Sequence, residues 1–148
     1  MEFTKFKHKT ETRVRSFHID SQSIVHNAWY FFFLEDGRAE YYRSIGMMVD
    51  KDTFTRHHKM QVVRNTCDYK SPAYFDDVLE VFTRTAYIKN SSVGIEQYII
   101  DSGTKRLIAE ATGILVYLDS DTNIPERVPD SIREKIGLFE GENVEFLL

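Results

Sequence analysis

The apolar residues of this chain recur with a helical spacing in its first third and with a strand pattern afterwards. The segment from Asn27 through Ile45 is apolar nearly all round in its first two turns and carries a solvated stripe further on. It therefore predicts one long helix, enclosed at its N-terminal end, with Asn27 as its N-cap and Gly46 as the glycine that ends it. A short strand over Arg13–His18 and a loop over Ile19–Val25 should precede this helix.

Four segments after this helix are rich in Val, Ile, Thr, Tyr and Phe, the residues that favour strands. These predicted strands are His58–Tyr69, Val78–Ile88, Ser92–Ile100 and Arg106–Tyr117. Short turn signals separate the last three, which should therefore form an antiparallel meander. A short terminal helix is expected over Val128–Ile136, with Pro129 near its start and Gly137 after it. Together these elements predict an α+β fold in which an antiparallel sheet curls around one long central helix.

The length and the charge of the chain narrow this picture. At 148 residues it is most simply one domain, with a core over about residues 12–136. The C-terminal tail, residues 137–148, is expected to pack on the sheet or at an interface. The net charge of −4 comes from interleaved acidic and basic residues, so neither nucleic acid nor an anionic membrane is an expected partner. No apolar run reaches the length of a membrane span.

The cysteine and aromatic contents carry further information. The single cysteine, Cys67, excludes an intramolecular disulfide and is typical of a reducing compartment. The N-terminal residues lack the continuous apolar core of a secretory signal, so a cytoplasmic location is expected. Eleven Phe and eight Tyr predict large apolar surfaces that are buried in a core, an interface or an acyl pocket.

The candidate chemistry begins at Asp20, which lies in the loop just before the long helix. A helix N-terminus offers unpaired backbone N–H groups and partial positive charge, and it can therefore stabilise a developing oxyanion. A carboxylate beside such an end is suited to acyl-group chemistry. On pattern alone we favour a simpler role for Asp20, because loop aspartates commonly accept hydrogen bonds from nearby backbone N–H groups.

Other chemistries find little support in the sequence. The five histidines show no metal-ligand spacing, and two of them, His57 and His58, would point to opposite faces of a strand. Neither a Gly-rich phosphate loop nor a Gly-x-Ser-x-Gly nucleophile elbow occurs. We therefore predict no metal site.

Several short motifs, taken in order, link the chain to a known family. They comprise Asp20, Val25, His26, Asn27 and Tyr30 at the helix start, Glu35 and Arg38 within the helix, Gly46 at its end, Tyr69-Lys-Ser-Pro72, Asp76-Asp77-Val78, Lys89-Asn-Ser-Ser92, and Ile124-Pro-Glu-Arg-Val-Pro129. Over roughly residues 12 to 136 the chain resembles the 4-hydroxybenzoyl-CoA thioesterase-like family of hotdog-fold acyl-CoA thioesterases. It departs from that pattern at Ser23 and Asp76, where the family usually has glycine.

This resemblance implies a fold, a reaction and a site. The fold is the hotdog fold, assembled as a homodimer or homotetramer whose sites contain residues of two chains. The reaction is hydrolysis of an acyl-CoA thioester to a free acid and CoA, without a metal or redox cofactor. Asp20 would act as general base or nucleophile, His26 would orient substrate or water, and the N–H of Asn27 or a neighbour would polarise the thioester. The residues expected to contact substrate are Tyr30, Tyr69, Lys89, Asn90, Ser91 and Ser92.

Three alternatives stay open at this level. Glu35 is the second candidate for the catalytic carboxylate, although it and Arg38 stand three apart and can simply pair along the helix. The substrate can be an acyl group on a carrier protein rather than on CoA. The protein can also bind acyl-CoA without turnover, because a fold does not determine a function.

Overall fold

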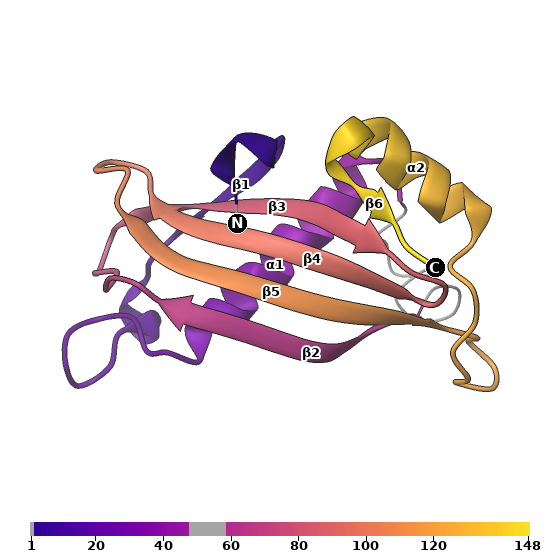
Figure 1. Cartoon of the computed structure of the whole chain (residues 1–148). Helices are drawn as coiled ribbons and strands as arrows, with labels where there is room; N and C mark the ends of the chain where they lie inside the picture. Colours follow the sequence, from indigo (N-terminus) through magenta and orange to yellow (C-terminus); the bar gives the residue numbers. More distant parts are fainter. Residues whose placement is uncertain (1, 48–58) are drawn as a thin grey trace.

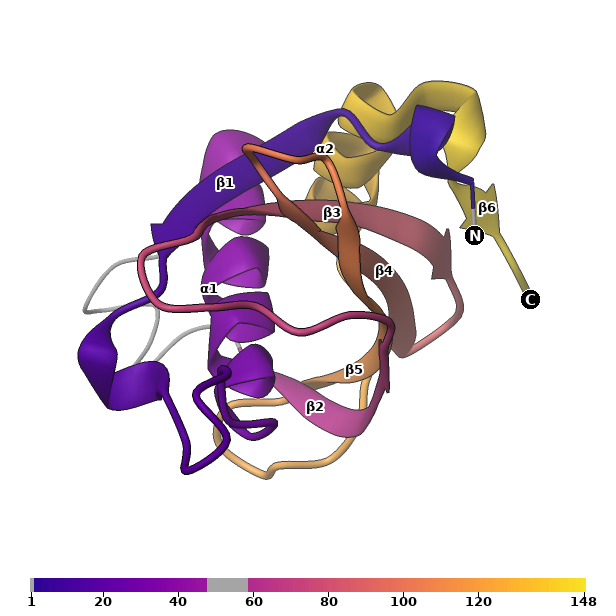
Figure 2. The same ribbon diagram turned by 90° about the vertical axis from the view of Figure 1, so that its left-hand side faces the viewer.

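The computed structural model describes residues 2–47 and 59–148, and in this part a six-stranded sheet wraps around helix α1 (Trp29–Ser44) (Figure 1, Figure 2). The strands are β1 (His8–Arg13), β2 (Lys59–Tyr69), β3 (Val78–Ile88), β4 (Ser92–Asp101), β5 (Leu107–Leu118) and β6 (Glu145–Phe146). Their order is β1-β3-β4-β5-β2, and β6 pairs with β3. The expected α+β arrangement, with the sheet curled around one helix, is confirmed.

The predicted meander is confirmed as three consecutive antiparallel strands, β3, β4 and β5. β2 adds to the outer side of β5, where Tyr69 pairs with Ala109. β1 adds to β3 at the other edge. The first residue of the predicted strand His58–Tyr69 lies outside the described residues.

Helix α1 turns one face toward the concave side of the sheet. Its buried residues are Tyr30, Phe33, Leu34, Gly37, Arg38, Tyr41 and Tyr42. Gly37 lies at the closest approach, since a Cβ at this position would stand 2.6 Å from the side chain of Val81. Arg38 is buried and donates to the Gln97 side chain at 3.2 Å, whereas Glu35 is exposed. Glu35 and Arg38 therefore differ in exposure, and no ion pair joins them in the described part of the chain.

The end of α1 confirms one expectation, because Gly46 has a φ of +88°, the left-handed conformation that favours glycine after a helix. The start of the chain corrects another. The first strand is His8–Arg13 rather than Arg13–His18, and Ser16–His18 forms a short 3₁₀ turn, η2. The position of this strand depends on tertiary structure, because residues 8–13 pair in register with the edge of β3.

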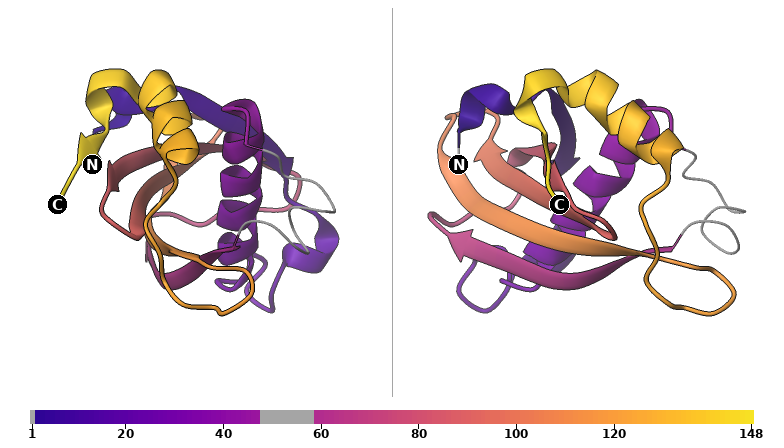
Figure 3. Two further views of the ribbon diagram at one scale, coloured as in Figure 1. Left: turned by 90° about the vertical axis from the view of Figure 1, so that its right-hand side faces the viewer. Right: turned by 45° about the vertical axis from the view of Figure 1, so that its right-hand side comes forward.

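The C-terminal helix α2 (Asp130–Glu140) is longer than predicted and includes Gly137. Gly137 does not end the helix, because its φ is not positive and it keeps the helical conformation. The ring of Phe146 lies in ordinary contact with it, 3.4 Å from where a Cβ would stand. The helix ends instead at Gly141, which has a φ of +61°. A 3₁₀ turn, η4 (Gly141–Asn143), then leads into β6, so the tail packs beside β3 and the C-terminal end of α1 (Figure 3).

None of the described helices is long and apolar enough to cross a membrane.

Candidate active site

The loop that carries Asp20 is a narrow hairpin closed by its own backbone. Ile19 and Val25 form an isolated bridge, and the Asp20 N–H donates to the Ile24 carbonyl at 2.9 Å. Asp20 Oδ1 accepts a hydrogen bond from the Gln22 N–H at 2.7 Å. Among the described residues none donates to the second oxygen, Oδ2. The half-buried carboxylate of Asp20 therefore closes the loop with one oxygen and keeps the other available.

Both departures from the family pattern preserve the backbone that glycine would adopt. Ser23 has a φ of 63° and Asp76 has a φ of 70°, both in the left-handed region. Asp tolerates this region better than most residues, and the Asp76 side chain also pairs with Arg13 at 3.0 Å. The turns beside Asp20 and before β3 thus each contain a left-handed residue that is not glycine.

Two neighbouring segments hold the Asp20 loop in place. The Val25 N–H donates to the Ala73 carbonyl, and the His26 N–H donates to the His18 carbonyl, both at 2.9 Å. His18 is buried, and its Nδ1 accepts from the Arg15 N–H at 2.8 Å. Burial lowers the pKa of His18, which favours the neutral imidazole that this acceptor role requires. Sequence reasoning missed His18 and Ala73, because both act through backbone carbonyls that no side-chain pattern marks.

The N-terminus of α1 is capped by a residue that was not expected to cap it. The Nδ1 atom of His26 accepts from the Ala28 N–H at 3.1 Å, and the His26 carbonyl accepts from the Trp29 N–H at 3.0 Å. The predicted N-cap role of Asn27 is wrong, since the N-cap position is Ala28 and Asn27 makes no side-chain cap. Within the described residues, the exposed Asn27 has no partner for its backbone N–H. An unbonded N–H at a helix start is the feature that an oxyanion donor needs.

Two tyrosines lie against this helix start. Tyr69, at the end of β2, donates its hydroxyl to the Asn27 carbonyl at 3.0 Å. Its ring packs edge-on to that of Tyr30, with centroids 5.1 Å apart. Tyr30 is buried, and burial raises its pKa to about 12, so its hydroxyl stays neutral. The structure thus gathers His26, Asn27, Tyr30 and Tyr69 around the helix end to which the Asp20 loop leads.

The turn Lys89–Ser92 lies far from these residues at the start of α1. Ser92 pairs with Val116 on β5, whereas Tyr69 pairs with Ala109 on the same strand. These two positions of β5 are seven residues apart, which corresponds to roughly 23 Å along the strand. The turn therefore lies at the opposite end of the sheet within one chain (Figure 1).

Hydrogen bonds from neighbouring segments hold the turn Lys89–Ser92 in place at its end of the sheet. The Asn90 carbonyl accepts from the Val128 N–H at 2.8 Å, and the Ser91 carbonyl accepts from the Tyr117 N–H at 2.8 Å. The Arg133 guanidinium donates to the carbonyls of Lys89 and Asn90. The side chains of Lys89 and Asn90 stay exposed.

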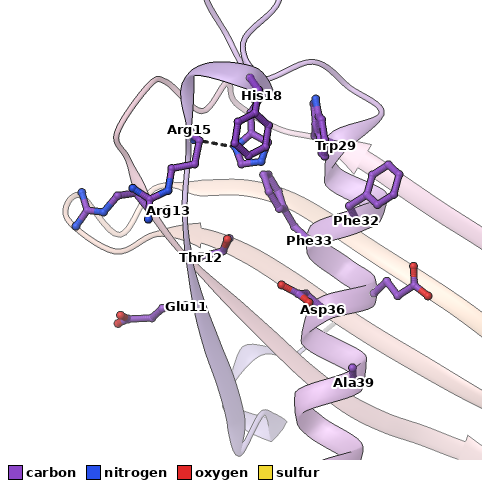
Figure 4. Close-up of a pocket in the computed structure, with 12 residues that line it drawn as sticks. Glu11, Thr12, Arg13, Arg15, His18, Trp29, Phe32, Phe33, Asp36 and Ala39 are labelled. Carbon is purple, nitrogen blue, oxygen red and sulfur yellow. Dashed lines mark hydrogen bonds between the residues drawn. The ribbon is translucent and has the colours of Figure 1, made fainter. Parts of the chain in front are cut away.

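A groove of about 590 Å³ lies between β1, η2 and the N-terminal half of α1 (Figure 4). Its aromatic residues are Phe17, Trp29, Phe32 and Phe33, and His18 stacks edge-on among them. Glu35 and Asp36 also line this groove. The alternative carboxylate Glu35 thus faces a space beside β1, at the other edge of the sheet from Tyr69 on β2.

Among the described residues, no group of three or more His, Cys, Asp or Glu side chains is arranged to hold a metal ion. Cys67 is half-buried, and burial raises the pKa of its thiol, which disfavours the reactive thiolate. The site thus offers one carboxylate oxygen in the loop that leads to α1 and one unbonded backbone N–H at the start of that helix.

Comparison with known proteins identifies the class to which this arrangement belongs. The model of the thioesterase-like superfamily matches residues 14–136, and the chain belongs to that family. The chain is 30% identical over 132 residues to the acyl-acyl carrier protein thioesterase ATL3 of Arabidopsis thaliana chloroplasts, covering 89% of this chain and 68% of that protein. It is 27% identical over 132 residues to the long-chain acyl-CoA thioesterase FadM of Escherichia coli strain K12, covering 86% and 96% respectively.

A solved structure adds to this comparison. A thioesterase from Thermus thermophilus, complexed with coenzyme A and Zn, superposes with a TM-score of 0.81 at 28% identity, covering 96% of this chain and 98% of that one. The resemblance to thioesterases, the hotdog fold and the expected class of enzyme, a thioester hydrolase, are thereby confirmed.

Proposed function

We propose that the protein hydrolyses acyl-CoA thioesters to a free carboxylic acid and CoA, with Asp20 as general base or nucleophile. The observation that supports the proposal is the presence of two available groups in the segment that runs from Asp20 to the start of α1. One is the free carboxylate oxygen of Asp20, and the other is the unbonded N–H of Asn27 at the start of α1. They are the two groups that thioester hydrolysis requires.

The proposed chemistry follows from these groups. The N–H of Asn27 and the positive end of the α1 dipole polarise the thioester carbonyl and stabilise the oxyanion that forms. As a base, Asp20 removes a proton from water as the water oxygen bonds to the carbonyl carbon. The carbon–sulfur bond then breaks, and the CoA sulfur leaves with that proton. As a nucleophile, a carboxylate oxygen of Asp20 bonds to the carbonyl carbon, the carbon–sulfur bond breaks and CoA leaves as a thiolate. Water then opens the mixed anhydride, which releases the acid, restores the Asp20 carboxylate and supplies the proton that the thiolate takes up.

A second copy of the chain would supply the rest of the site. The edge strand β2 pairs only with β5 among the described residues, and Val62 and Val63 are exposed on it at 36% and 57%. An unpaired apolar edge favours pairing with another strand. We propose a homodimer or homotetramer in which the turn Lys89–Ser92 of one copy meets the CoA that is bound beside Asp20 of the other.

The test is thiol release from a panel of short, long and aromatic acyl-CoAs by the wild type and by Asp20→Asn. Loss of a general base typically costs about 10²–10⁴-fold, so the variant should lose at least 100-fold in kcat while it still binds substrate. Asp121→Asn is the matched control, because Asp121 is exposed near the opposite end of the sheet. Full activity in Asp20→Asn, with loss in Glu35→Gln, would transfer the catalytic role to Glu35.

One alternative substrate has a specific observation in its favour. The 30% identity to an acyl-acyl carrier protein thioesterase supports a carrier-bound acyl group as substrate. Side-by-side turnover of the same acyl group on CoA and on acyl carrier protein decides between the two. Binding of acyl-CoA without turnover of either substrate would identify a non-catalytic binding protein.

Two expectations from the sequence remain proposals. We propose that hydrolysis needs no metal or redox cofactor, because Asp20 and the helix end supply both the base and the electrophilic donor. We also propose a cytoplasmic location, which the single cysteine Cys67 supports.

A further inference from the structure

Two consecutive peptide units at the start of α1 are held at every polar group except one. The first joins His26 to Asn27, and its carbonyl accepts from the Trp29 N–H at 3.0 Å. The second joins Asn27 to Ala28, and its N–H donates to His26 Nδ1 at 3.1 Å. The carbonyl of the second unit accepts from the Tyr69 hydroxyl at 3.0 Å. Within the described residues, the N–H of Asn27 is the one group of these four without a partner.

This arrangement determines where the free N–H points. A peptide unit is planar, so hydrogen bonds at both ends of the Asn27–Ala28 unit fix its plane. The hydrogen bond from the Trp29 N–H to the His26 carbonyl likewise restrains the plane of the His26–Asn27 unit, which contains the Asn27 N–H. The only soft torsions between the two planes are φ and ψ of Asn27, and both are constrained. The oxyanion donor is therefore oriented before any substrate binds.

Tyr69 is well suited to hold this peptide from outside the helix. It lies 42 residues from Asn27 in sequence, at the end of a strand, so it connects the helix start to the sheet. Its ring rests edge-on against Tyr30, which is 3% exposed. Burial raises the pKa of Tyr69, so the hydroxyl remains a donor at neutral pH. Because its proton is donated to Asn27, this hydroxyl is not free to donate a hydrogen bond to substrate.

His26 holds the same peptide from within the loop. Nδ1 accepts a hydrogen bond, so the proton of the neutral ring must reside on Nε2. The bond runs from a side chain to the N–H two residues later, which is the geometry that asparagine forms in an Asx-turn. Asparagine at position 26 can therefore replace this contact, whereas alanine cannot.

We infer that Tyr69 and His26 are positioning residues, which clamp the Asn27–Ala28 peptide between them so that the Asn27 N–H is oriented toward the thioester carbonyl. The inference rests on the proposed hydrolysis and replaces the direct substrate contacts that the sequence suggested for these two side chains. Loss of either contact lets the peptide rotate and weakens an interaction that matters most in the transition state. Such a loss lowers kcat and leaves KM nearly unchanged.

The kinetic test compares Tyr69→Phe, His26→Ala and His26→Asn with the wild type on one acyl-CoA. Removal of an oxyanion donor costs about 10²–10³-fold, so misorientation should lower kcat by roughly 10-fold or more in Tyr69→Phe and His26→Ala. KM should stay within about 3-fold. His26→Asn should recover most of the loss. The matched control is Tyr74→Phe, since Tyr74 is 45% exposed in the neighbouring loop and its hydroxyl has no hydrogen bond to any described residue.

A second measurement is independent of turnover. Amide hydrogen exchange at Ala28 should be faster in both Tyr69→Phe and His26→Ala than in the wild type, and near the wild-type rate in His26→Asn. A raised KM with unchanged kcat would make Tyr69 or His26 a substrate contact and overturn the inference, as would unchanged exchange at Ala28. If the wild type hydrolyses no thioester, the proposed function fails, and the exchange rates still decide whether the clamp exists.

Discussion

At its C-terminal end α1 is held by buried polar contacts, whereas its N-terminal end is held by partners that reach into solvent. Tyr41, in the last turns of the helix, is fully buried and bonds to Glu140 at 2.6 Å and to Thr85 at 2.9 Å. Tyr69, which holds the helix start, is 48% exposed. The C-terminal end of α1, the closed end, supplies stability. The N-terminal end, the open end, keeps the Asn27 N–H and one oxygen of Asp20 accessible. At a buried end both groups would need hydrogen-bond partners.

The apolar core also has two parts, one around each half of α1. One apolar cluster surrounds the first half of α1 and includes Val25, Tyr30 and Leu34. A second surrounds its last half and joins α2 to the sheet through Ile132 and Ile136. The C-terminal segment therefore closes one end of the sheet, whereas the loop Ile19–Val25 packs at the other end through Val25 and Ala73.

The largest effect is expected at the C-terminal end of α1, for Tyr41→Phe. This change removes the hydroxyl that donates to Glu140 and leaves a buried carboxyl oxygen with fewer partners, so the free energy of unfolding should fall by about 1–3 kcal/mol. Because Tyr41 lies fourteen residues, or roughly 21 Å, from Asn27 along the helix, kcat should not change. Urea unfolding and thiol release measure the two effects. Tyr69→Phe is the matched control, with the opposite outcome expected in each assay.

A smaller effect concerns the pH dependence of stability at Glu140. Burial raises the pKa of this carboxyl above its ordinary value of 4.5, so its neutral form is favoured in the folded protein. Its contribution is fully present below the unfolded pKa and is lost as pH rises through the folded pKa. The wild type should therefore lose stability relative to Glu140→Gln as pH increases above about 4.5.

The measurement is urea unfolding of both proteins between pH 4 and pH 9, where each unit of pKa shift corresponds to about 1.4 kcal/mol. Glu80 titrates with the opposite sign, since hydrogen bonds from Lys105 and Lys9 lower its pKa. It is present in both proteins, and its contribution cancels in the difference. A difference that is constant with pH would contradict the assignment to Glu140.

The smallest effect is expected at the open end, for Phe32→Ala. Phe32 is 60% exposed in the groove between β1 and α1, so its truncation should change the free energy of unfolding by no more than about 0.5 kcal/mol. The same urea assay measures it beside Tyr41→Phe. A loss above about 1 kcal/mol would mean that this end of the helix is packed as firmly as the other.

Much of the architecture was predictable because it depends on local patterns. The long helix with Gly46 at its end, the meander of β3 to β5 and the Asp20 loop before the helix all follow from apolar spacing and turn residues. Three details were wrong. β1 was misplaced because its register is set by β3. The predicted end of α2 at Gly137 was wrong because Gly137 stays helical and the left-handed glycine after the helix is Gly141.

The third detail concerns the site itself. Asn27 is a common N-cap residue, yet the capping contact comes from His26, and Tyr69 binds the carbonyl that follows. The sequence by itself determined the helix, the meander and a carboxylate beside a helix start, because spacing and residue type act over a few positions. Only the tertiary structure decided which N–H of that helix stays free. That choice depends on a histidine ring within the loop and on a tyrosine brought from an edge strand 42 residues away.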